Sequence, residues 1–491
     1  MPRVPVTQTS VRLESDASRV ITKHFAPGDD LTVAGRDRVD RILARIFSMS
    51  DAEVSATLAT TEERFAGRHA DLREVFEARY RTIIRHAAEM DEPSQERRLL
   101  VGAYFTHEYS VEAAALTNPS MVPAPDQTGL HAGAMRFVLS LRSIGEGHIS
   151  SVRFRSGVVD ASGSVTLDAQ GPFLRTATRF PAIYDKGVFR AKLEDLGGLS
   201  EGAALVLSQV EDSFTFDALE SAIRLLEADV GTGPEVVRTT RTLHWLASSS
   251  YRRTFAADSD ISERVLFPAA PTESRGMEDA RFVRFVRSDG SVVYYAPYTA
   301  FDGHEILPQL IETTDFVTFR MSTLNGDSAK NKGIALFPRQ INGRYAALSR
   351  IDNERNFLMW SDHVRVWEHS EVIQTPAQPW ELIQFGNCGS PLETDAGWLV
   401  ITHGVGPMRQ YAIGAILLDK EDPTKVVGHL REPLIEPDAQ ERDGYVPNVV
   451  YSCGSMIAGE RLVIPYGYSD AGARVATVRL EELVRALVES R

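Results

Sequence analysis

After Pro123 the chain becomes a succession of short apolar segments separated by tight turns, and this texture restricts the fold more than any other feature. The segments include "MRFVLSL", "SVVYYAPYTAF", "GWLVITHG" and "RLVIPYGYSD", and the turns include "SDGS", "INGR" and "TDAG". Asp, Asn and Gly at such positions are typical of hairpin connections. Many short strands with few helices between them predict a mainly β fold, either a β-propeller or a large sandwich. Periodicity alone does not separate the two, because no clean internal repeat is present.

The N-terminal part of the chain has a helical period instead. One apolar stripe recurs at i, i+3, i+4, i+7 and i+8 spacing; it comprises Val39, Ile42, Leu43, Ile46 and Phe47. The segment "SDAE" at 50–53 is a capping box that predicts the start of a second helix. A third helix is expected from "EPSQERR" onwards, stopped by Asn118 and Pro119. These patterns predict a helical N-terminal region over residues 1–116.

Two helical segments interrupt or end the β-rich part. The stretch "FDALESAIRLLEADV" predicts a helical insertion near 214–242, and "LEELVRALVES" predicts a C-terminal helix over 481–491. The β-rich domain is therefore expected to span residues 117–480.

Charge and cysteine content restrict the partners and the compartment. The formal net charge is −14, which argues against a long phosphate-binding face, so no nucleic-acid partner is expected. No window approaches eighteen apolar residues, so no membrane segment is expected. The two cysteines, Cys388 and Cys453, are expected to be reduced thiols of a cytoplasmic protein, with a single disulfide as the alternative. No metal-binding motif is complete, because "THEYS" lacks the second histidine of HExxH.

A carboxylate doublet lies in the stretch "ESRGMEDARFVRF", residues 273–285. Glu278 and Asp279 are adjacent, with Arg275 and Arg281 on either side. Neighbouring residues of a strand point to opposite faces, so one carboxylate is expected to face a cavity and the other to anchor an arginine. A carboxyl group at such a place can act as a general acid. The alternative is a solvated turn with local ion pairs.

Six motifs occur in order along the chain: "GMEDAR", "NKGIALFPRQINGRY", "GNCGSP", "GWLVITHGVG", "YAIGAILLDKEDP" and "YGYSD". Together they resemble glycoside hydrolase family 130, which comprises mannoside phosphorylases and some mannosidases. The similarity runs from about Ala114 to Leu480, and the helical extension resembles the longer branch that includes 1,2-β-oligomannan phosphorylases. The resemblance implies a five-bladed β-propeller with an α-helical N-terminal extension and a short C-terminal helix.

The resemblance also implies an activity and a set of site residues. Asp279 matches the aspartate of the family's G-x-E-D-P-R motif and is the implied general acid. In related phosphorylases this acid protonates the glycosidic oxygen through the mannose 3-hydroxyl, while inorganic phosphate attacks C1 with inversion and forms mannose 1-phosphate. The implied substrate-binding residues are Arg155, Tyr251, His403 and Asp470. The candidates for the phosphate clamp are Arg320, Lys332 and Arg350.

The implied partners are a β-mannoside oligosaccharide, expected to be β-1,2-linked, and inorganic phosphate as co-substrate, with no other cofactor and no metal. Three departures from the family pattern bear on the site. Ala280 replaces the motif's proline, Ser349 stands where some phosphorylases carry a histidine before Arg350, and Arg252 follows Tyr251 where a glutamate is usual. The phosphate site therefore cannot be copied whole from relatives.

Two other functions remain open on the sequence. An inverting β-mannosidase needs a second carboxylate to activate water, for which Glu354 and Glu381 are candidates. A phosphorylase instead needs basic residues to hold its anionic nucleophile, and the loops supply Arg and Lys generously. A non-catalytic carbohydrate-binding propeller is the third reading. The N-terminal helices are expected to form either a homo-oligomer interface or a substrate lid.

Overall fold

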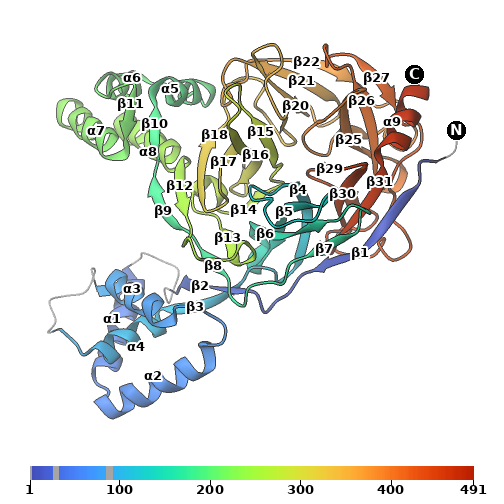
Figure 1. Cartoon of the computed structure of the whole chain (residues 1–491). Helices are drawn as coiled ribbons and strands as arrows, with labels where there is room; N and C mark the ends of the chain where they lie inside the picture. The colour runs from blue at the N-terminus through green and yellow to red at the C-terminus, as the bar shows by residue number, and fades with distance from the viewer. Residues whose placement is uncertain (1–2, 26–32, 85–91, 491) are drawn as a thin grey trace. The chain divides into compact units, whose positions relative to one another are not determined.

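The computed structural model describes residues 3–25, 33–84 and 92–490, and its architecture is mainly β, as the sequence predicts (Figure 1). The chain divides into two compact units. The larger unit comprises residues 1–15, 114–170 and 177–491, and the smaller comprises 16–113 and 171–176.

Apart from two strands of a helical insertion that pair with each other, the described strands of the larger unit form five groups. The first group contains β4 (Ala115–Pro123), β5 (Met135–Ile144), β6 (Ser150–Val159), β7 (Val165–Leu167) and β13 (Arg264–Leu266). The second contains β14 (Gly276–Glu278), β15 (Val283–Val286), β16 (Val292–Phe301), β17 (Ile306–Thr313), β18 (Thr318–Thr323), β12 (Tyr251–Thr254) and β9 (Thr178–Pro181). A parallel pairing between Gly276 and Ser150 joins these two groups into one sheet.

The remaining three groups follow along the chain as separate sheets. The third contains β19 (Ala335–Leu336), β20 (Tyr345–Ser349), β21 (Asn356–Ser361) and β22 (His369–Gln374). The fourth contains β23 (Gln384–Asn387), β24 (Leu392–Thr394), β25 (Gly397–Val405), β26 (Tyr411–Leu418) and β27 (Val426–His429). The fifth contains β28 (Val450–Tyr451), β29 (Met456–Ala458), β30 (Arg461–Tyr468), β31 (Gly472–Arg479) and β1 (Val6–Glu14).

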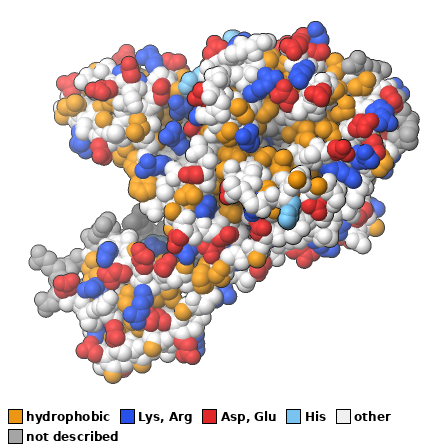
Figure 2. Space-filling view, viewed as in Figure 1, with side chains coloured by type: hydrophobic (Ala, Val, Ile, Leu, Met, Phe, Trp, Pro, Cys, Tyr) orange, Lys and Arg blue, Asp and Glu red, His pale blue; other side chains and the backbone are white. Residues whose placement is uncertain are grey.

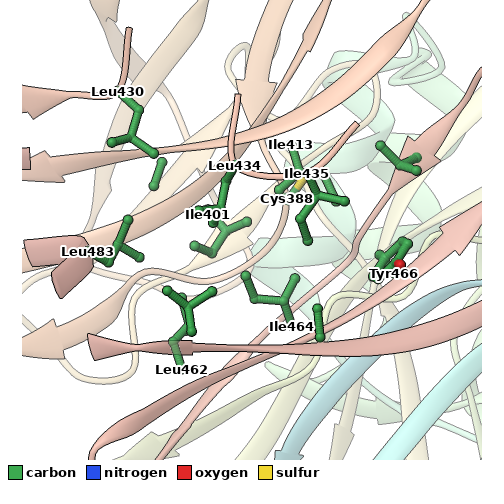
Figure 3. Close-up of a cluster of buried hydrophobic side chains, with 14 of the residues drawn as sticks. Cys388, Ile401, Ile413, Leu430, Leu434, Ile435, Leu462, Ile464, Tyr466 and Leu483 are labelled. Carbon is green, nitrogen blue, oxygen red and sulfur yellow. The ribbon is translucent and has the colours of Figure 1, made fainter. Parts of the chain in front are cut away.

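The hydrophobic cores of the larger unit lie between consecutive groups. Between the fourth and fifth groups, for example, Ile401 and Ile413 pack with Leu462 and Ile464 (Figure 3). Equivalent clusters join the first group to the second, the second to the third and the third to the fourth. A further cluster joins the fifth group back to the first. The packing order of the five groups is therefore cyclic.

The strand β1 corrects the expectation that residues 1–116 are helical throughout. It pairs antiparallel with β31, from Val6 opposite Val478 to Glu14 opposite Gly472. Val11 and Leu13 are buried, and the residues between and after them are exposed, so this segment has the period of a half-buried strand. The N-terminal strand belongs to the larger unit, and the helices begin only after it.

Within residues 16–25, 33–84, 92–113 and 171–176, the smaller unit contains four helices and a two-stranded antiparallel sheet. The helices are α1 (Val33–Phe47), α2 (Asp51–Phe65), α3 (Leu72–Ile84) and α4 (Gln95–Tyr104). The strands are β2 (Val20–His24) and β3 (Thr106–Ser110), and residues 171–176 include β8 (Arg175–Thr176).

The capping box predicted at Ser50 is present, and the apolar stripe of α1 contributes Leu43 and Ile46 to the core. The helix predicted to run from "EPSQERR" to Asn118 is α4, and it ends at Tyr104. After Tyr104 the chain forms β3, which pairs with β2, and then continues as β4.

A helical insertion is larger than the predicted 214–242. It contains β10 (Ile183–Asp185), α5 (Lys186–Asp195), α6 (Glu201–Ser208), β11 (Ser213–Thr215), α7 (Phe216–Val230) and α8 (Pro234–Ser248). Leu193, Leu219 and Leu243 are fully buried in a core of its own. Helix α8 contains "LHWLAS", whose apolar residues have helical spacing. The chain ends with α9 (Leu480–Glu489).

Among the residues that the structure describes, four short 3-10 turns lie in the loops: η1 (Glu146–His148), η2 (Ile261–Glu263), η3 (Pro271–Glu273) and η4 (Pro407–Arg409). Acidic and basic side chains are interspersed over the visible face of the molecule (Figure 2). Within residues 3–25, 33–84 and 92–490, no helix has the length and apolar character needed to cross a membrane. Both cysteines are buried and free, as predicted.

Candidate active site

Asp279 lies directly after β14 in a left-handed backbone conformation, with φ of 55°. Few non-glycine residues adopt this conformation, and such strain gathers at functional sites. The preceding Gly276 has φ of 145°, and a Cβ there would lie 2.8 Å from the backbone nitrogen of Ser150. This glycine lets β14 approach β6 closely, which fixes the start of the acidic segment.

The two carboxylates of the doublet lie on the same side of the chain. Arg142 on β5 donates to Glu278 Oε1 at 2.6 Å, and its other terminal nitrogen lies 3.6 Å from Asp279 Oδ1. The expectation that they point to opposite faces is wrong, because the strand ends at Glu278 and the positive φ of Asp279 turns its side chain back. Glu278 also accepts a hydrogen bond from Lys332 Nζ at 2.7 Å.

Asp279 is held as a carboxylate by the charges around it. Its side chain is only 13% exposed, and burial opposes ionisation. The positive charges of Arg142, Lys332 and Arg281, with a hydrogen bond from Asn118 Nδ2, outweigh that effect and lower the pKa of Asp279 below its usual value. The cations therefore set the protonation state of the implied acid.

Asp470 is a third carboxylate that faces this cluster. It follows β30 and also has a positive φ, of 49°. Burial raises the pKa of Asp470, and the charges of Asp279 and Glu278 raise it further, against the lowering effects of Arg142 and Arg409. The site thus contains two neighbouring carboxylates whose environments push their pKa values in opposite directions.

A buried polar network lies beside the acidic segment. Arg281 donates to the backbone oxygen of Asn387 at 3.1 Å and to the Tyr451 hydroxyl at 2.7 Å. Asn387 Nδ2 in turn donates to the backbone oxygen of Gly333 at 3.0 Å, next to Lys332. The segments carrying Asp279 and Lys332 are therefore tied to the same side chain, Asn387.

His403 and Arg350 form the next part of this network. Arg350 Nη1 lies 3.2 Å from His403 Nε2, and the imidazole packs edge-on against Tyr451 at 4.8 Å. Burial lowers the pKa of His403 far below its usual value, and the charges of Arg350 and Arg281 add to this effect. His403 is therefore a neutral imidazole that accepts from Arg350.

The structure brings five of the predicted residues together: Asp279, Lys332, Arg350, His403 and Asp470. Tyr251 requires a correction, because its side chain is fully buried and its hydroxyl donates to Glu273 at 2.8 Å. Tyr298 donates to the same carboxylate at 2.6 Å. Tyr251 therefore supports the segment that leads into Asp279 and does not line an open subsite.

Arg155 and Arg320 also lie elsewhere than predicted. Arg155 on β6 donates to the backbone oxygen of Asp168 at 3.1 Å. Arg320 on β18 is 63% exposed and lies 4.0 Å from Glu312. The side chain of an arginine on a strand can point to either face of its sheet, and the sequence alone does not say which.

Sequence reasoning missed Arg142 and Asn118. Arg142 comes directly after the apolar run "FVLSL" on β5, whereas the family resemblance pointed to Arg155 on the neighbouring strand β6. Asn118 reads as a helix stop, but it lies within β4 with φ of 48°. Asparagine is enriched in this conformation, so "TNPS" is a turn signal that also points to a functional amide.

Glu381 and Glu354, the candidate bases of a hydrolase, lie in different environments. Glu381 is fully buried and accepts from the amides of Ala377 and Gln378 at 2.9 and 3.0 Å, so it stabilises a turn. Glu354 is exposed between β20 and β21. Across the part of the chain that the structure describes, no group of three His, Cys, Asp or Glu side chains is arranged to hold a metal ion.

Comparisons with known proteins place the chain in a family. Residues 257–489 match the model of glycoside hydrolase family 130 described as beta-1,4-mannooligosaccharide phosphorylase. A 1,2-beta-oligomannan phosphorylase of Thermoanaerobacter sp. is 34% identical over 230 residues, which are 45% of this chain and 75% of that protein. A beta-1,2-mannobiose phosphorylase of Listeria innocua is 26% identical over 366 residues, covering 71% of this chain and 95% of the relative.

The solved structure of a beta-1,2-mannobiose phosphorylase from Listeria innocua, in complex with beta-1,2-mannobiose, is also similar to this chain. It superposes with a TM-score of 0.46 at 20% identity and covers 77% of this chain and 93% of that one. The Thermoanaerobacter relative carries the assignment, because it is 34% identical to this chain and the match covers 75% of its own length. The chain belongs to glycoside hydrolase family 130.

Proposed function

We propose that this protein is a glycoside phosphorylase that cleaves β-mannosides with inorganic phosphate, with inversion, to give mannose 1-phosphate. The observation that carries the proposal is the group of cations facing Asp279, of which Arg142 and Lys332 are also bound to Glu278. An anionic nucleophile needs such a group, whereas a water molecule does not.

Each member of the cluster has a role in this proposal. Asp279 is the general acid that delivers a proton toward the glycosidic oxygen. Lys332 and Arg350, with Arg142 replacing Arg320 as the third cation, bind the phosphate that attacks C1. Asp470 and the neutral His403 hold the mannosyl unit. Glu278 keeps Arg142 and Lys332 in place while the site is empty.

An acid that is ionised at rest fits this scheme. The cations that lower the pKa of Asp279 are the same groups that would bind phosphate. A phosphate dianion would offset their charge and so raise the pKa of Asp279. Binding of phosphate would therefore favour protonation of Asp279. This couples phosphate binding to proton donation without a second base.

The names of the relatives support a β-1,2 linkage for the mannoside that is cleaved. Three curated relatives are named as phosphorylases of β-1,2-linked oligomannan or mannobiose, so β-1,2-mannobiose and its longer homologues are the proposed substrates. The cyclic packing of five strand groups supports a five-bladed β-propeller, in which the site lies near the common axis. A cytoplasmic location and a homo-oligomer formed through the smaller unit are further parts of the proposal.

The test is to incubate the protein with β-1,2-mannobiose in the presence and absence of phosphate and to identify the products. Phosphorolysis gives α-mannose 1-phosphate and mannose in equal amounts, and only when phosphate is present. Equal release of free mannose in both tubes would instead support an inverting mannosidase. Sugar binding without turnover on any β-mannoside would support a carbohydrate-binding propeller.

A further inference from the structure

A cavity of about 210 Å³ lies between the helical insertion and the loops beside the candidate site. The insertion contributes Lys192 from α5, Leu196 directly after that helix, and Trp245 from α8. The opposite wall is formed by residues 302–308 and 326–331. None of these positions has a role in the chemistry proposed above, so the cavity needs an explanation of its own.

The charges on the cavity wall select a class of ligand. Four carboxylates, Asp195, Asp302, Glu305 and Asp327, outnumber the ammonium groups of Lys192 and Lys330. A phosphate or sugar phosphate would meet net repulsion there. Carboxylates and ammonium groups around a partly exposed indole suit instead a neutral ligand with many hydroxyls, which presents both polar edges and an apolar face.

The cavity is adjacent to the small cavity beside Asp279. Pro308 and Asn331 line it, and the same two residues line the small cavity that contains Asp279. Glu278 pairs with Thr299, and Thr299 pairs with Pro308, across β14, β16 and β17. Two strand spacings amount to about 10 Å, so a ligand in the cavity lies beyond the sugars that flank the cleaved bond.

Helix α5 also fixes the loop that joins the two cavities. Lys192, which is buried, donates to the backbone oxygen of Leu324 at 3.0 Å. Asp195 Oδ2 accepts from the amide of Gly326 at 2.8 Å. The same loop continues to Asn331 and Lys332. The insertion therefore builds one wall of the cavity and holds the other.

We propose that this cavity is a distal subsite that binds a mannosyl ring on the acceptor side of longer β-mannosides. The proposal rests on the function proposed above, and it makes the helical insertion a device for chain-length preference. Trp245 supplies the face for the sugar ring, and Glu305, Lys330 and Asn331 supply groups for its hydroxyls.

The experiment compares kcat/KM for β-1,2-mannotetraose and β-1,2-mannobiose in wild type, Leu196→Trp and Leu225→Trp. Leu196 is 38% exposed at the cavity edge, so the larger ring fills the cavity from outside. Leu225 on α7 is 59% exposed in the same insertion and does not line the cavity, which makes it the matched control. We expect the tetraose-to-biose ratio to fall about tenfold in Leu196→Trp and to stay unchanged in the control.

An unchanged ratio in a folded Leu196→Trp variant, or an equal fall in the control, would overturn the subsite. If Leu196→Trp does not fold, Glu305→Ala takes its place, because Glu305 is an exposed wall residue. A protein that turns over no mannobiose contradicts the proposed function alone. Calorimetric titration of Asp279→Asn then decides the subsite: tighter binding of tetraose than biose, abolished by Leu196→Trp, supports it, and equal binding overturns it.

Discussion

At the scale of single residues, the strained backbone of Asp279 is matched by an unusual set of neighbours. Its carboxylate receives a hydrogen bond from Asn118 and lies 3.6 Å from Arg142. We expect Asp279→Asn to lower kcat by about 10²- to 10⁴-fold, the range that general acids contribute. Phosphorolysis of β-1,2-mannobiose measures the loss. Asp443→Asn, at an exposed position, is the control, and an equally active Asp279→Asn would contradict the assignment.

Lys332 belongs to the proposed phosphate site, and its charge lowers the pKa of Asp279. Replacing it by Met removes a charge that lowers the pKa of Asp279, so that pKa rises. We expect the alkaline limb of the pH profile for kcat/KM of the mannoside to move to higher pH. The KM for phosphate should rise roughly 10- to 100-fold, the effect of a lost hydrogen bond to a charged group.

The control for this variant is Lys425→Met, which removes an exposed lysine paired with Asp422. A Lys332→Met protein with a raised KM for phosphate but an unmoved alkaline limb would show that the limb does not report Asp279. A limb that moves to lower pH would contradict the electrostatic argument itself.

The raised pKa of Asp470 predicts that this residue lowers the stability of the fold at the pH where it is ionised. Its pKa is raised by burial and by two neighbouring carboxylates, so the folded state binds this proton more tightly than the unfolded chain does. The stabilisation that comes from this tighter proton binding is present below the pKa of Asp470 in the unfolded chain. It is lost as the pH rises through the pKa of Asp470 in the folded state. At neutral pH the ionised side chain therefore destabilises the fold.

We expect Asp470→Asn to raise Tm by roughly 2 °C at neutral pH, with a smaller gain at acidic pH and with loss of phosphorolysis. Differential scanning calorimetry at several pH values measures this. Asp443→Asn again serves as the control, and a gain in Tm that is independent of pH would contradict the role of burial.

At the scale of elements, the approach of β14 to β6 determines where the doublet lies. In Gly276→Ala the new Cβ would lie 2.8 Å from both the backbone nitrogen and the Cβ of Ser150, at a φ that alanine rarely adopts. We expect destabilisation of about 1–3 kcal/mol from the backbone strain alone and a loss of activity, because Asp279 moves with β14.

Gly290→Ala is the matched control for this prediction. It also has positive φ, of 81°, but nothing lies within 4 Å of its Cβ. Denaturant unfolding and mannobiose phosphorolysis of both variants separate strain from clash. Equal effects on activity in the two variants would show that the close pairing of β14 with β6 does not position the site.

How much of this could be predicted from sequence depends on the kind of element. Alternation and turn residues found the strands, and the motif series found the family and Asp279. The direction of single side chains was harder. Arg142 and Arg155 end neighbouring apolar runs on β5 and β6, and only the sheet shows which one faces Glu278. Likewise, the positive φ of Asp279, which turns it toward Arg142, has no signal in "MEDAR".

At the scale of the whole molecule, the two ends of the larger unit are joined in one sheet. Strand β1 pairs with β31, and β1 buries Val11 and Leu13 against the first strand group. This antiparallel ladder ties residues 6–14 to residues 472–478, so the N-terminal strand contributes to the stability of the last strand group. The smaller unit is inserted after this strand, and its entry and exit lie close together, since the Asp16 amide donates to Glu112 at 3.2 Å.

Two deletions should therefore behave differently. Removing residues 16–113 with a short Gly-Ser linker between Ser15 and Ala114 keeps β1 in the sheet, and we expect a folded protein with mannobiose phosphorolysis retained. Removing residues 1–116 also deletes β1. The apolar side chains that pack against Val11 and Leu13 then become exposed, which should lower the free energy of unfolding by about 3–6 kcal/mol. Denaturant unfolding measures the difference, and light scattering of the first deletion shows whether the helices form an oligomer. Equal stability of the two proteins would mean that β1 does not hold the last strand group.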